Sequence, residues 1–301
     1  MKYYFIVNPA AGKGGIKETL EKEIASLPQK DDCIIYETTF PGDEKVFVEK
    51  TIEENKRKKL MFIACGGDGT INGVFSAAVG HDNVSVSVYP CGSGNDFVKV
   101  FGADKFSDVK AILEAPVQKI DALKVGDNHY SFNVTNFGFD TTVAITINKE
   151  REKSGHGNKN AYTKGVVTAL LTSMNNKGKV WADGELLNES GKFLLCTCAN
   201  GQYVGGSFKC APRASLNDGL IEVCVIKPIS RIKFVTILGT YTNGEHLEAD
   251  NCKKIVTYRQ AKKVHVEAPE GFAYSLDGEI IYENNFDVEI VPAALNLAVP
   301  E

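Results

Sequence analysis

The stretch Ala64-Cys65-Gly66-Gly67-Asp68-Gly69-Thr70-Ile71-Asn72 is the most informative part of this sequence. It follows the apolar run 60–63 and leads into the largely apolar run 71–79, which predicts a buried strand, a glycine-rich turn and a helix. Glycines in such a turn let backbone N–H groups approach a phosphate, and the helix adds the positive end of its dipole. A carboxylate at Asp68 inside an anion-binding turn indicates that a metal ion or a hydroxyl proton is handled there too. The turn therefore predicts phosphate chemistry rather than phosphate binding alone.

Length and composition describe an ordinary globular protein of about two domains. The chain has 301 residues, of which 43% are hydrophobic and 24% are charged, and its formal net charge is −4. This charge argues against a nucleic-acid partner, which would require a basic surface. The eight cysteines show no zinc-ligand spacing, and we interpret them as buried free thiols in a reducing cytosol. No run approaches the about 18 apolar residues that span a bilayer. We therefore expect a cytoplasmic protein that at most lies on the inner face of the membrane.

The first third of the chain alternates strand and helix patterns. Residues 3–7, 33–37, 60–65 and 84–89 read as strands, and residues 16–27, 43–58 and 71–79 have helical spacing. This alternation predicts an α/β domain with a doubly wound parallel sheet that carries helices on both faces. In such a sheet, ligands bind beyond the carboxyl ends of the strands. All three glycine-rich turns, at 8–15, 66–70 and 90–96, fall at those ends.

A domain boundary is expected near residues 116–121, where the pattern becomes rich in short strands. Strand-like runs are found at 122–125, 130–134, 192–199, 219–226, 262–267, 272–276 and 286–291, and helical runs at 161–174 and 230–241. They predict a β-sandwich-like second domain over 120–292, after a first domain over 1–119 onto which the tail 293–301 packs back. The polar insert 149–164 is interpreted as a mobile loop. Lone edge strands in the second domain would allow a homodimer.

The first glycine-rich turn reads Asn8-Pro9-Ala10-Ala11-Gly12-Lys13-Gly14-Gly15. It is not a P-loop, because glycine rather than serine or threonine follows Lys13, and it is not a GxGxxG motif. Its backbone N–H groups and the Lys13 ammonium can still hold phosphate oxygens. The alternative is an ordinary strand-to-helix turn with a solvated lysine.

The third turn reads Pro90-Cys91-Gly92-Ser93-Gly94-Asn95-Asp96-Phe97. A hydroxyl, an amide and a carboxylate within five residues supply hydrogen-bond donors together with an acceptor for a metal ion or a proton. The alternative is a turn in which Asn95 or Asp96 caps the next helix, but that accounts for only one of the three polar side chains.

Two later turns carry carboxylates. Asp218-Gly219 could offer oxygen ligands to a hard cation, although a plain hairpin turn explains the same residues. Asp277-Gly278-Glu279 ends a strand-like run, and either carboxylate could accept a proton or orient a metal-bound phosphate. A hairpin turn is again the alternative. The five histidines show neither metal-ligand spacing nor a nucleophile partner.

Taken in order, these motifs resemble those of the diacylglycerol kinase catalytic-domain superfamily, which includes bacterial soluble diacylglycerol kinases, other bacterial lipid kinases and sphingosine kinases. The segments that carry the resemblance are 8–13, 66–72, 90–97, 211–219 and 277–279, and together they extend over nearly the whole chain. The resemblance implies a Rossmann-like N-terminal domain, a C-terminal β-sandwich-like domain and an active site in the interdomain cleft. It also implies ATP and Mg²⁺ as cofactors.

The resemblance assigns roles to individual residues. The expected ATP contacts are Asn8, Pro9, Ala10, Ala11, Gly12, Lys13, Thr38, Thr39, Gly66, Gly67, Asp68, Gly69, Thr70, Ile71, Asn72, Gly92, Ser93, Gly94, Asn95 and Lys164. Many relatives have threonine where this chain has Ser93, and the hydroxyl is retained. Ser215, Asp218 and Leu220 match positions that hold a structural magnesium, the outer two through backbone carbonyls. Glu279 matches the proposed proton acceptor, and Asp277, Asp68 and Asp96 complete the expected catalytic set.

The resemblance implies transfer of the γ-phosphate of Mg-ATP to a lipid alcohol, for which diacylglycerol, giving phosphatidic acid, is the first choice. The basic segments 56–59 and 149–164 could meet anionic headgroups of a membrane surface, or could simply be a solvated helix end and a loop. One alternative is a phosphotransferase of the NAD kinase or phosphofructokinase kind, which also uses a GGDG turn. Another is a non-catalytic regulator that binds a nucleotide or a lipid. A Rossmann dehydrogenase is excluded because no GxGxxG opens the first helix.

Overall fold

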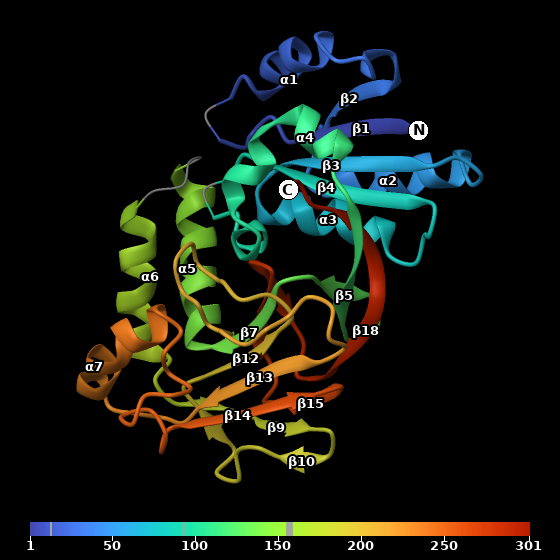
Figure 1. Cartoon of the computed structure of the whole chain (residues 1–301). Coiled ribbons are helices and arrows are strands. Elements are labelled where there is room, and N and C mark those ends of the chain that lie inside the picture. Colours follow the sequence, from blue (N-terminus) through green and yellow to red (C-terminus); the bar gives the residue numbers. More distant parts are fainter. Residues whose placement is uncertain (13, 93, 155–158) are drawn as a thin grey trace. The chain divides into compact units, whose positions relative to one another are not determined.

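The computed structural model describes residues 1–12, 14–92, 94–154 and 159–301, without the side chains of 151–154 and 159–160. It divides into two compact units (Figure 1). Unit 1 comprises residues 1–122 and 292–301, and unit 2 comprises residues 123–291. The chain passes between the units within β5 (Val117–Val125) and again within β18 (Asn285–Ala298).

Unit 1 is built on a parallel sheet. Its strands are β1 (Lys2–Val7), β2 (Cys33–Glu37), β3 (Leu60–Gly66) and β4 (Val84–Pro90), which lie side by side in the order β2-β1-β3-β4. The end of β18 adds to β4 in parallel, with Leu297 opposite Val86. The helices are α1 (Ile16–Ala25), α2 (Asp43–Glu54), α3 (Asp68–Ala78) and α4 (Val109–Glu114). Short 3₁₀ helices occupy Lys30–Asp32, Phe97–Val100 and Ala103–Ser107.

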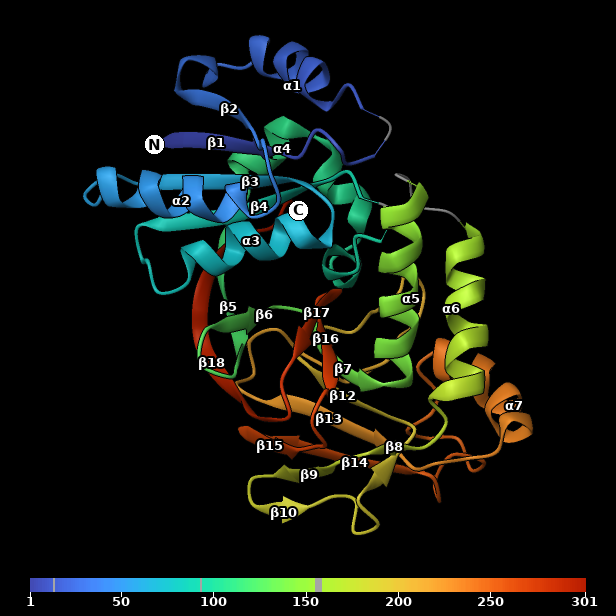
Figure 2. The same ribbon diagram turned by 180° about the vertical axis from the view of Figure 1, so that it is seen from behind.

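Helices cover both faces of this sheet (Figures 1 and 2). On one face, Leu20 of α1 and Ile112 of α4 join a buried cluster with Phe5 of β1. On the other face, the ring of Tyr4 contacts Phe47 of α2, with ring centroids 6.1 Å apart. Successive residues of β1 thus point to opposite faces, as the pleat of a strand requires. The predicted doubly wound α/β arrangement is confirmed.

Unit 2 contains an antiparallel sheet with the order β14-β13-β12-β7-β16-β17. These strands are β7 (Val134–Gly138), β12 (Leu195–Ala199), β13 (Ile221–Ile226), β14 (Val256–Ala261), β16 (Ala273–Leu276) and β17 (Glu279–Tyr282). A second group of strands has the order β10-β9-β15-β18, with β9 (Lys179–Ala182), β10 (Glu185–Leu186) and β15 (Lys263–Glu267). The remaining strands are β6 (His129–Ser131), β8 (Asn176–Lys177) and β11 (Lys192–Phe193).

Two cores hold unit 2 together. One lies between the two groups of strands and includes Phe137, Val223 and Val264. The other lies where α5 (Phe139–Ser154), α6 (Lys159–Thr172) and α7 (Arg231–Thr242) cover the outer face of the β7-β12-β13 region. The predicted β-sandwich-like character is confirmed. None of the helices in the described part of the chain has both the length and the apolar composition required to cross a bilayer.

Three local predictions were wrong. The expected strand 192–199 is interrupted, because β11 ends at Phe193 and β12 begins at Leu195 in another sheet. The insert 149–164 is not a loop where it is described, because 149–154 end α5 and 159–164 begin α6, while 155–158 lie outside the described residues. The expected strand 130–134 is interrupted: β6 ends at Ser131 and β7 begins at Val134.

Candidate active site

The candidate site of unit 1 lies at the carboxyl edge of its sheet. Because β2, β1, β3 and β4 are parallel neighbours, the segments that follow them meet at one edge. Thr38 follows β2, Asn8 follows β1, Gly67 follows β3 and Cys91 follows β4. Turns that are far apart in sequence thus become neighbours in space.

Asn8 joins the first turn to the second. Its side-chain amide donates to Thr70 Oγ1 at 3.3 Å, and its carbonyl oxygen accepts from the Ala10 backbone N–H at 3.0 Å. Thr70 lies in the first turn of α3, and Pro9 and Ala10 are exposed. A phosphate at this edge would therefore meet a turn whose shape is fixed by the Asn8 side chain.

Close backbone approach explains the glycines. A Cβ on Gly92 would lie 2.5 Å from the Cα of Gly67, so the turns after β3 and β4 touch through their main chains. Gly12 has a positive φ of 65°, and a Cβ on it would lie 2.9 Å from the carbonyl oxygen of Cys91. The first and third turns are thereby in contact as well. Side chains at these positions would push the three turns apart.

Two carboxylates flank Gly94. A Cβ on Gly94 would lie 2.6 Å from Oδ2 of Asp68 and 3.8 Å from Oδ2 of Asp96. Asp68 Oδ1 accepts a hydrogen bond from the Asp96 backbone N–H at 2.9 Å, and Asp96 forms an ion pair with Lys99 at 2.6 Å. The structure therefore brings these two predicted acids together, one at the start of α3 and the other in the third turn.

Asn95 closes the third turn and does not cap a helix. Its backbone has a positive φ of 49°, its Oδ1 accepts from the Gly92 N–H at 3.0 Å, and its Nδ2 donates to the Gly92 carbonyl at 2.8 Å. Burial raises the pKa of the adjacent Cys91 thiol to about 11, which keeps that thiol protonated and unreactive at neutral pH.

The remaining predicted nucleotide contacts in unit 1 have structural partners of their own. Thr38 donates its backbone N–H to Val7 at 2.9 Å. Thr39 donates both its backbone N–H and its hydroxyl to Asp43 of α2, and the backbone hydrogen bond is the main cause that lowers the Asp43 pKa. Ile71 is buried within α3, where Asn72 accepts from Ser76. Gly66 ends β3, and Gly69 is exposed. Ala11 donates its N–H to the Asn8 carbonyl. Lys13 and Ser93 lie outside the described residues.

In unit 2, Asp277 and Glu279 belong to the hairpin between β16 and β17. Leu276 pairs with Glu279, which leaves Asp277 and Gly278 as a two-residue turn with φ angles of 48° and 99°. The Asp277 carboxylate accepts four hydrogen bonds: Oδ1 from the Ser131 hydroxyl at 2.7 Å and from the N–H groups of Asn133 and Val134, and Oδ2 from the Phe132 N–H at 2.9 Å. Glu279 is exposed.

These contacts give the two carboxylates of the hairpin different environments. Both oxygens of Asp277 are engaged in holding the segment between β6 and β7, which is the arrangement of a positioning residue. Glu279 is the first residue of β17 and pairs with Leu276 across the hairpin. Its side chain is exposed. A hairpin anchored through Asp277 therefore presents an exposed carboxylate at Glu279.

The predicted magnesium loop precedes β13. The Ser215 hydroxyl donates to Asn217 at 3.1 Å, and the exposed Asp218 accepts from the Leu220 N–H at 3.0 Å. Among the residues that the structure describes, no three His, Cys, Asp or Glu side chains gather as a metal site. The expected ligands, one carboxylate and two carbonyl oxygens, are nonetheless the hard donors that Mg²⁺ accepts.

Lys164, the predicted ATP contact in unit 2, lies on α6. Its side chain is exposed and forms an ion pair with Glu150 of α5 at 2.6 Å.

Asp140 is an ionisable residue that the sequence analysis missed. It lies in the first turn of α5, its Oδ2 atom is buried, and burial raises its pKa to about 6, while the nearby Tyr241 hydroxyl opposes the shift. Carboxyl groups with strongly shifted pKa values are enriched at functional sites. The only sequence signal was its position two residues after the end of the buried strand β7.

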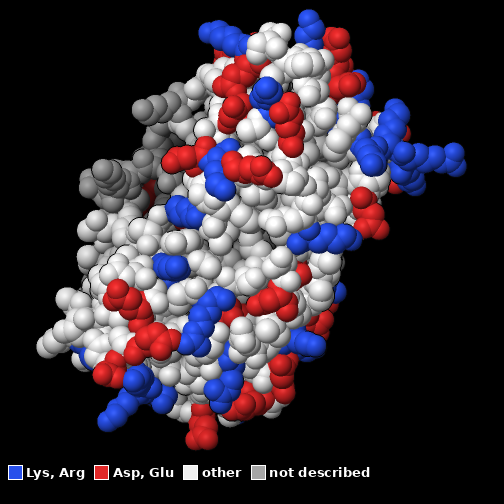
Figure 3. Space-filling view, in the orientation of Figure 1, with Lys and Arg blue, Asp and Glu red and all other residues white. Residues whose placement is uncertain are grey.

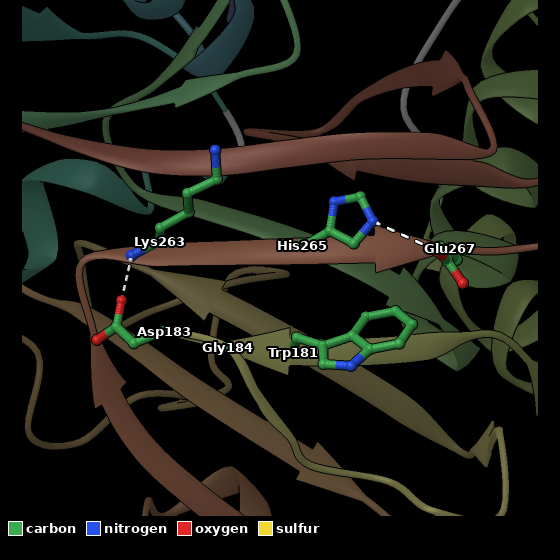
Figure 4. Close-up of a pocket in the computed structure, with 6 residues that line it drawn as sticks. All are labelled: Trp181, Asp183, Gly184, Lys263, His265 and Glu267. Carbon is green, nitrogen blue, oxygen red and sulfur yellow. Dashed lines mark hydrogen bonds and ion pairs between the residues drawn. The ribbon is translucent and has the colours of Figure 1, made fainter.

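A shallow pocket of about 590 Å³ on unit 2 contains none of the predicted site residues. Figure 4 shows its lining side chains, with the Trp181 ring beside His265. The ring centroids are 5.4 Å apart, and His265 Nδ1 lies 2.6 Å from Asp287. Lys263 forms ion pairs with Asp287 and Glu289. The charges of this face are thus satisfied among themselves.

Comparison with known proteins identifies two family matches that together cover nearly the whole chain. Residues 2–125 match the family described as the diacylglycerol kinase catalytic domain. Residues 133–299 match the family described as the YegS C-terminal NAD kinase beta sandwich-like domain. The chain is 29% identical over 284 residues to a diacylglycerol kinase of Bacillus subtilis, an alignment that spans 91% of this chain and 88% of that protein.

Other relatives and a solved structure agree. A probable lipid kinase YegS-like of Alcanivorax borkumensis is 27% identical, with 86% of this chain and 84% of that protein covered. The crystal structure of a putative diacylglycerol kinase from Bacillus anthracis superposes with a TM-score of 0.76 over 99% of this chain and 96% of that one, at 22% identity. The two matched families, the relatives and the shared fold together show that the chain belongs to the diacylglycerol kinase catalytic-domain superfamily, a family of lipid kinases.

Proposed function

We propose that this protein transfers the γ-phosphoryl group of Mg-ATP to the hydroxyl of a lipid alcohol, with diacylglycerol as the acceptor and phosphatidic acid as the product. The observation that carries the proposal is the convergence of three glycine-rich turns around the paired carboxylates Asp68 and Asp96. Family membership supports a kinase, and the diacylglycerol kinase of Bacillus subtilis supports the choice of acceptor.

The turns of unit 1 would hold the phosphates. Phosphoryl transfer depends mainly on alignment and on neutralising charge, which backbone N–H groups and the N-terminus of α3 can supply. Bound Mg²⁺ would offset the charge of the phosphate oxygens, and Asp68 and Asp96 are suited to orient it directly or through water. Asp96 also forms an ion pair with Lys99, so cations are favoured beside this pair of acids.

The Glu279 carboxylate would accept the proton of the acceptor hydroxyl. The hydroxyl oxygen forms a bond to the γ-phosphorus as the bond to the β–γ bridging oxygen breaks, and ADP leaves with the electron pair of that bond. The exposure of Glu279 on a hairpin fixed by Asp277 supports this role. The family resemblance assigns the proton acceptor to the same position.

Incubation with Mg-ATP and a panel of lipid extracts, followed by mass detection of an added phosphate, tests the activity. We expect diacylglycerol to be phosphorylated, and we expect Glu279→Ala to lower kcat by about 10²- to 10⁴-fold while ATP still binds. Glu270→Ala, an exposed glutamate of the same unit, is the matched control and should retain full turnover. Near-normal turnover of Glu279→Ala would remove that residue from the mechanism. Failure of every lipid to gain phosphate would refute the proposed function.

A further inference from the structure

Helices α6 and α7 expose four large aliphatic side chains. Val167 and Leu171 of α6 are 50% and 68% exposed, and Ile232 and Val235 of α7 are 79% and 64% exposed. Spacings of four and three residues place each pair on one face of its helix. We call these four residues the apolar patch.

The two halves of the patch are held next to each other. The Arg231 guanidinium donates to the backbone carbonyl of Leu170 at 2.6 Å and to that of Leu171 at 3.3 Å. The end of α6 is thereby fastened to the beginning of α7, an arrangement visible in both Figures 1 and 2. The opposite faces of the helices are used by the core, in which Ala169 and Phe234 are buried. The patch is therefore the outward side of a rigid helical layer.

The charged side chains that α6 and α7 themselves carry have one sign. Neither α6 nor α7 contains an aspartate or a glutamate, although the whole chain has more acidic than basic residues. Lys164 is paired with Glu150 of α5, whereas Arg231 and Lys233 lie beside the exposed aliphatic residues at the start of α7. In Figure 3 a white area lies on the left-hand margin, with both red and blue groups beside and below it. An apolar surface with cations at one end, here Arg231 and Lys233, complements the acyl region and anionic headgroups of a bilayer.

We propose that the apolar patch is the surface by which this protein lies on an anionic lipid bilayer. The inference rests on the proposed function, because the acceptor lipid resides in a membrane. Self-association through the patch is disfavoured, because a two-fold symmetric contact would bring the Arg231 and Lys233 groups of both copies together. On a bilayer the same cations would face phosphates.

Vesicle co-sedimentation without nucleotide tests the surface separately from the chemistry. Vesicles of phosphatidylcholine, with or without phosphatidylglycerol, are compared for the wild type, for Leu171→Gln/Ile232→Gln and for Lys233→Gln. Each aliphatic side chain that leaves water contributes about tenfold to partitioning, so the double variant should bind about 100-fold more weakly. Lys233→Gln should weaken binding only when phosphatidylglycerol is present. The matched control is Phe40→Gln/Val46→Gln, whose residues are 56% and 54% exposed in unit 1 and which should bind like the wild type.

A second measurement separates this inference from the proposed function. The double variant should retain phosphorylation of a water-soluble short-chain diacylglycerol and lose phosphorylation of diacylglycerol in vesicles. Vesicle binding equal to that of the wild type would overturn the docking surface, even if the protein proves to be a kinase. Unchanged vesicle binding with a changed oligomeric state would overturn it as well, and would identify a contact between copies. If the double variant loses vesicle binding but the wild type phosphorylates no lipid, the proposed function would be refuted. The docking surface would still be supported.

Discussion

Replacing Asp277 with asparagine measures how strongly the β16–β17 hairpin is anchored. The carboxylate accepts four hydrogen bonds, and three of their donors are backbone N–H groups of the buried residues 132–134. If the amide oxygen of asparagine replaces Oδ1, its NH₂ group must face the Phe132 N–H and cannot accept the hydrogen bond that Oδ2 accepts now. The other three hydrogen bonds persist but lose their charge. A lost hydrogen bond to a charged group and weaker remaining ones together amount to about 3 kcal/mol of unfolding free energy.

Asp183 provides the matched control for this substitution. It also begins an Asp-Gly hairpin with a positive φ, here 47°, and its carboxylate also accepts backbone N–H groups. Both of those donors, at Lys262 and Lys263, lie within reach of the single oxygen Oδ1, at 3.1 and 2.9 Å, and the side chain is exposed. An asparagine can keep both bonds, so Asp183→Asn should cost less than about 1 kcal/mol. Asparagine adopts the left-handed backbone conformation as readily as aspartate does. The turn conformation therefore does not contribute to the expected difference in stability between the two variants.

Urea unfolding followed by tryptophan fluorescence is the assay, with far-UV circular dichroism as a second probe. Trp181 is the only tryptophan of the chain and lies in the same unit as both hairpins. We expect Asp277→Asn to be clearly less stable than Asp183→Asn. Equal losses for the two variants would refute the reasoning, because they would mean that the buried donors do not depend on the carboxylate.

Two further predictions follow from the same structure. Gly92→Ala places a methyl group 2.5 Å from the Cα of Gly67 and should lower kcat/KM for ATP by about 100-fold through displacement of the turns, whereas Gly239→Ala, with no atom within 4 Å of its added Cβ, should not. Steady-state kinetics with varied ATP decide this, and an unimpaired Gly92→Ala would contradict a tight contact between the turns. Asp140 has a folded-state pKa raised to about 6 by burial, so it binds its proton more tightly in the folded protein. Its contribution to stability is therefore present at low pH and is lost as the pH rises from about 4 to about 6, by about 3 kcal/mol. Asp140→Asn should remove this decline and be the more stable protein at pH 8, as measured by urea unfolding across pH; an identical pH profile in both proteins would exclude Asp140 as its source.

Part of the candidate site was predictable from sequence because its signals are local. Glycine-rich turns after apolar runs identified the ends of β1, β3 and β4, and the alternation of patterns predicted a parallel sheet. In contrast, helix α5 was expected to be partly a loop, since its second half is polar and rich in lysine. Its stability comes from packing against α6 and the sheet below, through residues such as Val143 and Phe139. That packing is not written in the composition of the segment.

The amino-acid sequence alone determined where the chain must turn tightly and which turns carry acids, because glycine conformational freedom and strand periodicity act over a few neighbouring residues. Tertiary structure decided which of those groups meet. It joined Gly67 to Gly92, engaged both oxygens of Asp277 with the segment that interrupts the predicted strand 130–134, and buried the Asp140 carboxylate. Burial and hydrogen-bond partners depend on residues that are distant along the chain, so local propensity cannot specify them.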